Sequence, residues 1–253
     1  MTQKPRIAAT IEARMTSSRL PGKVLMPCLG KPMLDHMVER VRRATVLDDI
    51  IIATTVNDTD EPICAAARRL QVKYYRGSED NVMSRVLEAA QHHNVDIIVE
   101  LTGDCPLLDP ALIDLAVSEY HASGVDYLCN LKDEDYAAGQ SHPLGFAVQV
   151  FSTDVLADAY ARTDDPLDYE HVSRPLYRNP DRYSVKYLPT PAAQCGSNMS
   201  VTLDTPQDYQ VICAVMAALS PEKPDFTIED VVAYLKGHPE ICRINQDIGR
   251  VKV

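Results

Sequence analysis

The first half of the chain alternates strand-like and helix-like segments, and this order restricts the possible folds more than any other feature. Short apolar or β-branched runs are typical of strands that are buried on both faces. Longer segments with apolar residues three or four positions apart are typical of amphipathic helices. The expected strands are 6–11, 50–55, 72–75 and 95–101, and the expected helices are 33–44, 60–70, 80–93 and one that begins at Asp109-Pro110. This order predicts an α/β fold with a mostly parallel sheet flanked by helices on both faces.

The second half of the chain is less regular. No linker rich in Gly or Ser and no internal repeat divides the sequence, so we expect one domain over residues 1–253, with an inserted lobe in the second half. The expected strands there are 125–131, 145–151, 183–188 and 200–203, and the expected helices are 153–162, 168–177 and one from Thr205-Pro206 to about Leu219.

Charge and cysteine content exclude several classes of function. The formal net charge is −11, which argues against nucleic acid or an anionic membrane as a general partner. The seven cysteines are odd in number and form no CxxC pair, which favours the reduced thiols of a cytoplasmic protein over a disulfide framework or a zinc site. No apolar stretch reaches the roughly 18 residues of a membrane span, and the N-terminus does not resemble a signal peptide.

Three cations lie close together in the segment that follows the first expected strand. Arg14, Arg19 and Lys23 fall within ten residues, at the strand end where open α/β sheets bind ligands. Arginine can chelate a phosphate with two hydrogen bonds, and lysine adds a compact charge. Neither GxxxxGK[ST] nor GxGxxG is present here. The segment indicates a polyphosphate site of another kind, and the alternative is a solvated basic loop.

Two aspartates also follow expected strands. Asp104 comes after strand 95–101, and Asp204 comes after strand 200–203. Mg²⁺ commonly takes one or two carboxylates together with phosphate oxygens and water, so these two residues are candidate ligands. A turn residue at Asp104 and a helix cap at Asp204 are the structural alternatives.

In their order, these motifs resemble those of bacterial sugar cytidylyltransferases. The chain looks like the spore-coat polysaccharide branch and, more distantly, like 3-deoxy-manno-octulosonate cytidylyltransferase. The resemblance runs from about Arg6 to Tyr209 and rests on Arg14-Met15 and on residues 17–23, 30–33, 103–106 and 204–208. It implies a Rossmann-like nucleotidyltransferase fold with an acceptor or dimerisation lobe, with the nucleotide half at about 1–124 and the acceptor and C-terminal half at about 125–253.

The resemblance also implies an activity. CMP would pass from CTP to a small acceptor, with Mg²⁺ as cofactor, release of pyrophosphate and a homodimer as the assembly. Arg14, Arg19 and Lys23 would hold the triphosphate, and Asp104 and Asp204 would hold the metal. Further nucleotide contacts would come from Ala13, Ser18, Ser78, Asp80, Asn81 and Gly103, and acceptor contacts from Gln149, Glu170, His171 and Arg174.

The sequence departs from this pattern at two places. Glu12 and Thr16 stand where the branch usually has Gln and Gly, and Thr16 would be strained if it required a positive φ. Ala147 and Gln149 stand where the family commonly has acids. The absence of acids there favours the hypothesis of an anionic acceptor that carries a phosphate, phosphonate or carboxylate, and the alternative is neutral drift or a structural role.

Several alternatives remain open from the sequence. Ser78 and Asp80 could only cap a helix, and His171 could only be a buried structural histidine. At the level of function, the alternatives are a nucleotidyltransferase that uses another NTP, a glycosyltransferase and a non-catalytic nucleotide-binding protein. The sequence contains no evident general base.

Overall fold

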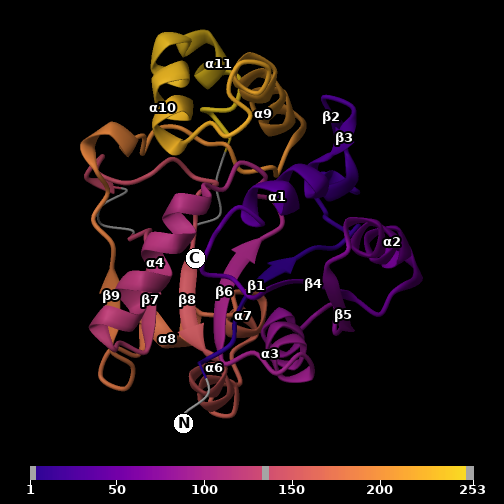
Figure 1. Cartoon of the computed structure of the whole chain (residues 1–253), viewed down its shortest axis with the longest axis vertical. Coiled ribbons are helices and arrows are strands. Elements are labelled where there is room, and N and C mark those ends of the chain that lie inside the picture. Colours follow the sequence, from indigo (N-terminus) through magenta and orange to yellow (C-terminus); the bar gives the residue numbers. More distant parts are fainter. Residues whose placement is uncertain (1–3, 133–136, 249–253) are drawn as a thin grey trace.

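A seven-stranded sheet forms the centre of the computed structural model, which describes residues 4–132 and 137–248 (Figure 1). Its strands are β1 (Ile7–Glu12), β4 (Asp49–Thr55), β5 (Lys73–Gly77), β6 (Ile97–Thr102), β7 (Tyr127–Cys129), β8 (Gln149–Ser152) and β9 (Val185–Tyr187). Their order is β5-β4-β1-β6-β8-β7-β9. Neighbouring strands are parallel, except that β8 runs antiparallel to both β6 and β7. A short hairpin of β2 (Pro27–Cys28) and β3 (Lys31–Pro32) lies outside this sheet.

Helices cover both faces of the sheet. On one face, a large apolar core joins the sheet to α1 (Met33–Val41), α2 (Glu61–Leu70) and α4 (Pro110–Ser123), and the same core extends to α9 (Pro206–Leu219) and α10 (Ile228–Gly237). On the other face, a smaller core joins it to α3 (Val82–His92), α6 (Thr153–Tyr160) and α8 (Arg174–Arg178). The remaining short helices are α7 (Pro166–Glu170) and α11 (Pro239–Arg243), with 3₁₀ turns at Lys23–Leu25, Asp58–Asp60 and Ala192–Gln194.

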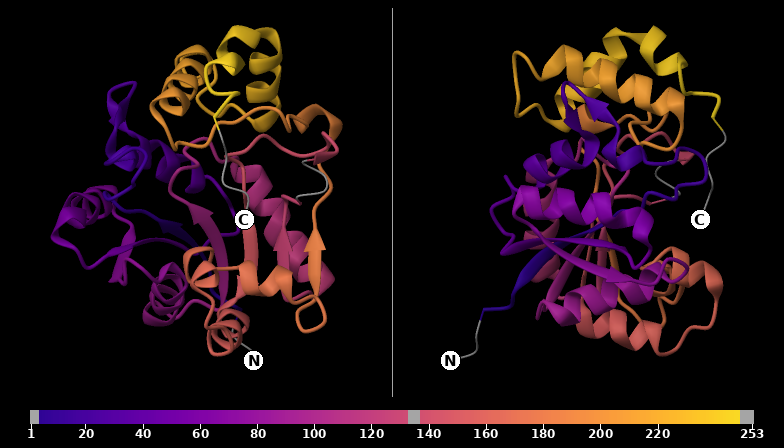
Figure 2. Two further views of the ribbon diagram at one scale, coloured as in Figure 1. Left: turned by 180° about the vertical axis from the view of Figure 1, so that it is seen from behind. Right: turned by 90° about the vertical axis from the view of Figure 1, so that its right-hand side faces the viewer.

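The C-terminal helices α9, α10 and α11 form a layer of their own beyond one end of the sheet (Figure 2). The N-terminus lies at the opposite end of the molecule. Two capping boxes begin the longer helices of this layer: Thr205 and Asp208 at α9, and Thr227 and Asp230 at α10. Such reciprocal side-chain bonds satisfy backbone N–H groups that have no partner within the helix.

The α/β architecture agrees with the expectation from the sequence, and most boundaries differ by only a few residues. Asp109 caps α4 with Pro110 in the first turn, and Thr205 caps α9 with Pro206 in its first turn, as predicted. The sequence did not indicate the hairpin or α10 and α11.

Three predicted segments were wrong. The expected helix 168–177 is two short helices, because the chain turns between them at Val172, whose φ is 31°. The expected strand 200–203 contributes only an isolated bridge between Ser200 and Leu144. Strand β8 begins at Gln149, so Ala147 lies outside the strand that was expected at 145–151 and does not share a strand face with Gln149.

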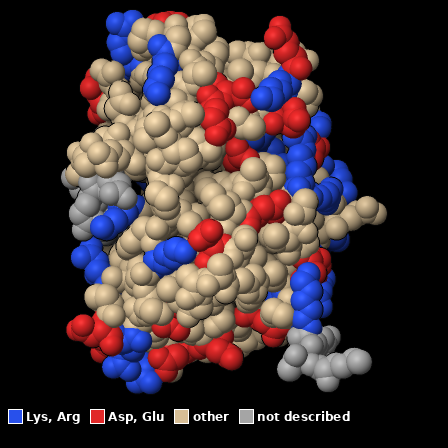
Figure 3. All heavy atoms as spheres, turned by 60° about the vertical axis from the view of Figure 1, so that its left-hand side comes forward, with Lys and Arg blue, Asp and Glu red and all other residues tan. Residues whose placement is uncertain are grey.

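Within the described ranges, no helix combines the length and apolarity that crossing a membrane would need. Acidic and basic side chains are interspersed over the face seen in Figure 3.

Candidate active site

The cationic loop leaves β1 and is held against the neighbouring strand β4. Ala13 N donates to Ala53 O at 3.2 Å, and Met15 N donates to Asp60 Oδ1 at 2.8 Å. The Asp60 carboxylate is fully buried and also accepts from the Thr54 hydroxyl. Gly22 closes the loop by donating to Met15 O at 2.9 Å, with a φ of 71° that favours glycine. Thr16 does not have a positive φ, so the strain considered for it does not arise.

The two aspartates converge on Lys23 although they are a hundred positions apart in the chain. Lys23 Nζ lies 3.1 Å from Asp104 Oδ2 and 2.9 Å from Asp204 Oδ1. Arg19 reaches the same Asp204 oxygen at 3.0 Å. A backbone bond from Leu203 N to Asp104 O, 2.7 Å long, fixes the approach of the two segments. Tertiary structure thus brings together four of the residues that the sequence indicated.

Electrostatics in this cluster favour the charged forms. Burial opposes the charge on Lys23, but Asp104 and Asp204 outweigh it and raise the pKa of the ammonium. Burial likewise opposes the charge on Asp104, and Lys23 together with the Thr102 hydroxyl outweighs it and lowers the pKa of that carboxyl. The cluster is therefore a stable arrangement of one cation between two carboxylates.

The position of Lys23 bears on whether a metal fits here. Its ammonium occupies the point between the two carboxylates, so the structure itself places a cation there. Within residues 4–132 and 137–248, no group of three or more His, Cys, Asp or Glu side chains is arranged to hold a metal. Mg²⁺ needs few protein ligands and prefers carboxylate oxygens completed by phosphate oxygens and water, so Asp104 and Asp204 suit this ion once Lys23 leaves the point between them.

The stretch before α3 borders the cationic loop. Glu79 accepts hydrogen bonds from Thr16 and Asn57 and lies 3.9 Å from Arg14. Asn81 caps α3 by accepting from Ser84 N at 2.8 Å. The Ser78 hydroxyl accepts from Asn81 N, whereas Asp80 is exposed and does not cap the helix.

Of the other predicted nucleotide contacts, Ser18 is exposed on the loop and Ala13 is buried at its start. Gly103 packs directly against β1, because its N–H donates to Glu12 O at 2.9 Å and a Cβ would lie only 2.2 Å from that oxygen.

The predicted acceptor residues gather on the face of the sheet that α3 covers. Gln149 Oε1 accepts from the Tyr127 hydroxyl at 2.7 Å and from Ser173. Glu170 lies 3.5 Å from Arg14, which links this region to the cationic loop. His171 is partly buried, and burial lowers the pKa of its imidazole.

Arg174 has partners of its own. Its guanidinium pairs with Asp165 at 2.8 Å and with Asp168. An acceptor anion at Arg174 would have to compete with both carboxylates, so the cation of this region with the weaker protein contacts is Arg14.

Two acidic residues that the sequence did not indicate as a pair lie between the cationic loop and the region around Gln149. Glu12 ends β1 and Glu100 lies in β6, and each faces the other on the α3 side of the sheet. Glu100 is directly opposite Gln149 in the register of β6 and β8. An acid inside the apolar run 95–101 was the signal that could have identified Glu100. Its presence beside Gln149 means that this surface retains acidic groups despite Ala147 and Gln149.

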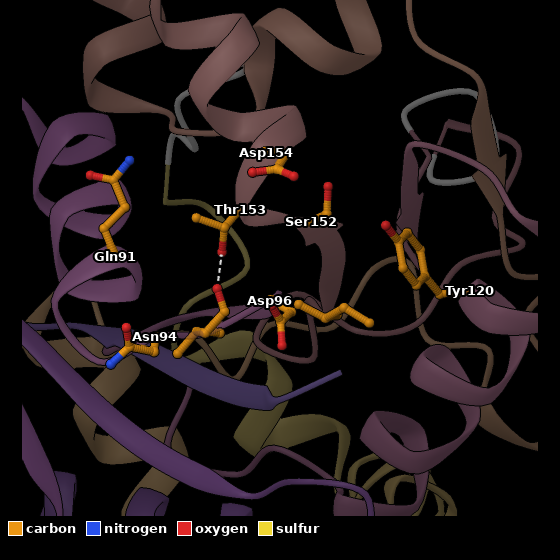
Figure 4. A pocket seen from close by; sticks show the side chains of 9 residues that line it. Gln91, Asn94, Asp96, Tyr120, Ser152, Thr153 and Asp154 are labelled. Atoms are coloured by element: carbon orange, nitrogen blue, oxygen red, sulfur yellow. Dashed lines mark hydrogen bonds between the residues drawn. The ribbon is translucent and has the colours of Figure 1, made fainter. Parts of the chain in front are cut away.

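A separate hollow of about 530 Å³ lies at the amino end of β6 (Figure 4). Thr153 donates its hydroxyl hydrogen to Val95 O there at 2.6 Å. Its lining residues are Gln91, Asn94, Val95, Asp96, Ile97, Tyr120, Ser152, Thr153 and Asp154, and none of them belongs to the cluster around Lys23.

Comparison with known proteins identifies the family of this chain. The profile described as cytidylyltransferase matches residues 8–219. The chain is 31% identical to the spore coat polysaccharide biosynthesis protein SpsF of Bacillus subtilis over 235 residues, 91% of this chain and 94% of that protein. It is 37% identical to 3-deoxy-manno-octulosonate cytidylyltransferase of Geobacter metallireducens over 115 residues, 45% of this chain and 44% of that one.

A solved structure of a cytidylyltransferase from Leptospira borgpetersenii superposes with a TM-score of 0.86 and 26% identity, covering 98% of this chain and all of the other. The loop, the converging aspartates and these similarities lead to one conclusion: this chain belongs to the cytidylyltransferase family and is a CTP-dependent nucleotidyltransferase.

Proposed function

We propose that this enzyme uses Mg²⁺ and transfers CMP from CTP to a small acceptor that carries a phosphate, phosphonate or carboxylate, with release of pyrophosphate. The observation that carries the proposal is the convergence of Asp104 and Asp204 on Lys23. It supports a site in which a divalent cation and a polyphosphate are held side by side.

In this proposal, Arg14, Arg19 and Lys23 bind and orient the triphosphate. As the bond to the leaving group breaks, negative charge grows on the pyrophosphate oxygens, and Lys23 and Arg19 stabilise it. Positioning and electrostatic stabilisation supply most of the rate enhancement in such transfers. Mg²⁺ held by Asp104 and Asp204 would polarise the α-phosphate.

The acceptor class is supported by the relatives and by one cation. The two curated relatives are named for spore coat polysaccharide biosynthesis and for 3-deoxy-manno-octulosonate, which favours a sugar-like acceptor. Arg14 is partly exposed and only loosely paired with Glu79 and Glu170, so its guanidinium can contact an acceptor anion as well as the triphosphate. We also propose a homodimer, as the family resemblance implies.

The test is pyrophosphate release with CTP, UTP, GTP and ATP against a panel of sugar acids, sugar phosphates and phosphonates. We expect release with CTP alone, only when Mg²⁺ is added, and with an anionic acceptor. Release with UTP or GTP at the same rate would contradict the choice of donor. Release of a free nucleotide instead of pyrophosphate would support a glycosyltransferase, and size-exclusion chromatography with light scattering tests the dimer.

A further inference from the structure

The pair formed by Glu12 and Glu100 follows from the register of two neighbouring strands. β1 and β6 are parallel, with Thr10 opposite Glu100 and Glu12 opposite Thr102. Residues two apart on adjacent strands have their side chains on one face, so both carboxyls point toward α3. Glu100 is 3% exposed, whereas Glu12 is partly exposed at the end of its strand. Only Glu12 can therefore meet a ligand.

This place has polar atoms without partners. Five buried side-chain atoms of the described residues lack a hydrogen bond, and four of them belong to Thr10, Glu12, Arg85 and Glu100. Arg85 is 2% exposed and donates to the backbone of Ser78 and Glu79 instead of to a carboxylate. Two ionised carboxylates so close together and so poorly solvated repel each other. A single proton shared between them removes this repulsion and gives each a hydrogen bond.

Charged groups approach the pair from every side. Glu12 is in electrostatic contact with Glu100 of β6, Arg85 of α3, Asp104 of the loop after β6 and Glu170 of α7. Arg14 of the cationic loop acts on Arg85, and Tyr127 and Cys129 of β7 face Glu100. Burial is the largest effect and raises the pKa of Glu12 to about 7, although Glu100 and Arg85 oppose it. Burial and then Glu12 raise the pKa of Glu100 well above its ordinary value.

Glu12, with a pKa of about 7, therefore lies beside Glu100, whose pKa is raised well above its ordinary value. A proton acceptor works best when its pKa is near the operating pH. Glu12 lies two residues before Arg14, and Gly103 joins its backbone to the residue before Asp104. The pair is thus placed between the cationic loop and the Gln149 region.

We propose, resting on the function proposed above, that Glu12 accepts the proton of an acceptor hydroxyl that attacks CTP, and that Glu100 is a positioning residue for Glu12. The O–H bond of the acceptor breaks and its proton passes to the Glu12 carboxylate. The oxygen forms a bond to the α-phosphorus, and the bond from that phosphorus to the pyrophosphate oxygen breaks with its electron pair. The Glu12 carboxylate thereby becomes neutral and returns the proton to water afterwards.

This step narrows the acceptor class. A phosphate or phosphonate oxygen is already ionised at neutral pH and has no proton to give. A proton-accepting pair is useful only if the attacking atom is a hydroxyl oxygen. Among the proposed acceptors, this step favours one that attacks through a hydroxyl, such as a sugar acid with its carboxylate toward Arg14.

The experiment compares the wild type with Glu12→Gln, Glu100→Gln and the control Glu88→Gln, an exposed acid on α3. Pyrophosphate release from CTP is measured from about pH 5.5 to about pH 9 with a sugar acid, with a sugar phosphate and with water as the only acceptor. CTP affinity is measured by calorimetry for each variant.

We expect the wild-type rate with the sugar acid or with water to rise with pH through an inflection near neutrality. Glu12→Gln should lose roughly 10²–10³-fold in rate and the inflection itself, with unchanged CTP affinity. Glu100→Gln should keep the high-pH rate and move the inflection to higher pH, because the hydrogen bond from Glu100 that opposes the effect of burial on Glu12 is lost. Glu88→Gln should behave as the wild type.

Three results would overturn the proposal: a wild-type rate profile in Glu12→Gln, turnover confined to the sugar phosphate, or a ¹³C NMR titration in which Glu12 and Glu100 titrate as ordinary carboxyls. The NMR arm needs no acceptor. Failure of the proposed function is recognised separately, as absence of CTP binding in the wild type.

Discussion

Two pairs of carboxyls lie at the same edge of the sheet and are held in opposite states. Asp104 and Asp204 share Lys23, and the pKa of Asp104 is lowered. Glu12 and Glu100 face each other, and the pKa of Glu12 is raised to about 7, first by burial. Burial disfavours charge in both pairs, so the opposite directions of their pKa shifts come from the close contact with a cation in the first pair. The first pair favours the ionised form of its carboxyls, and the second pair favours the protonated form.

Gly103 joins these two regions. Its N–H donates to Glu12 O, and the next residue is Asp104. Substitutions of the side chains in either pair leave this backbone hydrogen bond in place, whereas a substitution of Gly103 alters it.

The largest effect should come from the pair that shares a cation. In Asp104→Asn or Asp204→Asn we expect turnover to fall by roughly 10²–10³-fold at saturating Mg²⁺, because one metal ligand and its charge are lost. Initial rates of pyrophosphate release measure this, with Asp181→Asn, an exposed turn residue, as control. Wild-type turnover in either variant would disprove the metal assignment.

A large loss of stability should follow from Gly103→Ala. The added Cβ would lie 2.2 Å from Glu12 O, so the two strand ends must separate. We expect a cost of about 2–3 kcal/mol, or a Tm lower by roughly 4–12 °C in calorimetry. Gly237→Ala is the matched control, because nothing lies within 4 Å of its Cβ position. Equal Tm values for the two variants would mean that this contact is not a tight one.

A smaller effect is expected on how the stability of the protein changes with pH, because of the pair formed by Glu12 and Glu100. Because the folded-state pKa of Glu12 is raised to about 7, its contribution to stability is complete below the unfolded value and is lost as the pH rises through neutrality. Glu12→Gln removes this dependence, so the variant should gain on the wild type by on the order of 1 kcal/mol between about pH 5 and about pH 8. Calorimetric Tm values across this range measure it, and parallel curves would count against a shared proton.

The smallest effect on catalysis should come from Arg174→Gln. Asp165 and Asp168 already neutralise this arginine, so we expect a KM for the acceptor within about two-fold of the wild type and a stability loss of about 1 kcal/mol. Steady-state kinetics with varied acceptor decide this. A KM raised more than about ten-fold would instead assign Arg174 to the acceptor, as the sequence suggested.

Much of the fold was readable from local sequence. The alternation of apolar runs gave the order of strands and helices in the first half, and capping residues such as Asp109 and Thr205 marked helix starts. The break at Val172 was not readable, because tertiary packing holds that residue at a positive φ that its side chain disfavours. The lack of a strand at 200–203 was equally hidden, since a strand depends on a partner elsewhere in the chain.

The candidate site divides in the same way. The cationic loop was visible because its three cations are neighbours in sequence, and Asp104 was visible because it follows an apolar run. Glu12 was noticed only as an extra charge, and Glu100 was not singled out.

The sequence by itself determined the α/β class, the cationic loop and the caps, because these depend on residues within a few positions of one another. Only the tertiary structure decided that Asp204 reaches Lys23, through the bond from Leu203 to Asp104, and that Glu12 meets Glu100. Strand register and long-range backbone contacts choose the neighbours of a carboxyl, and those neighbours fix whether it carries a charge or a proton.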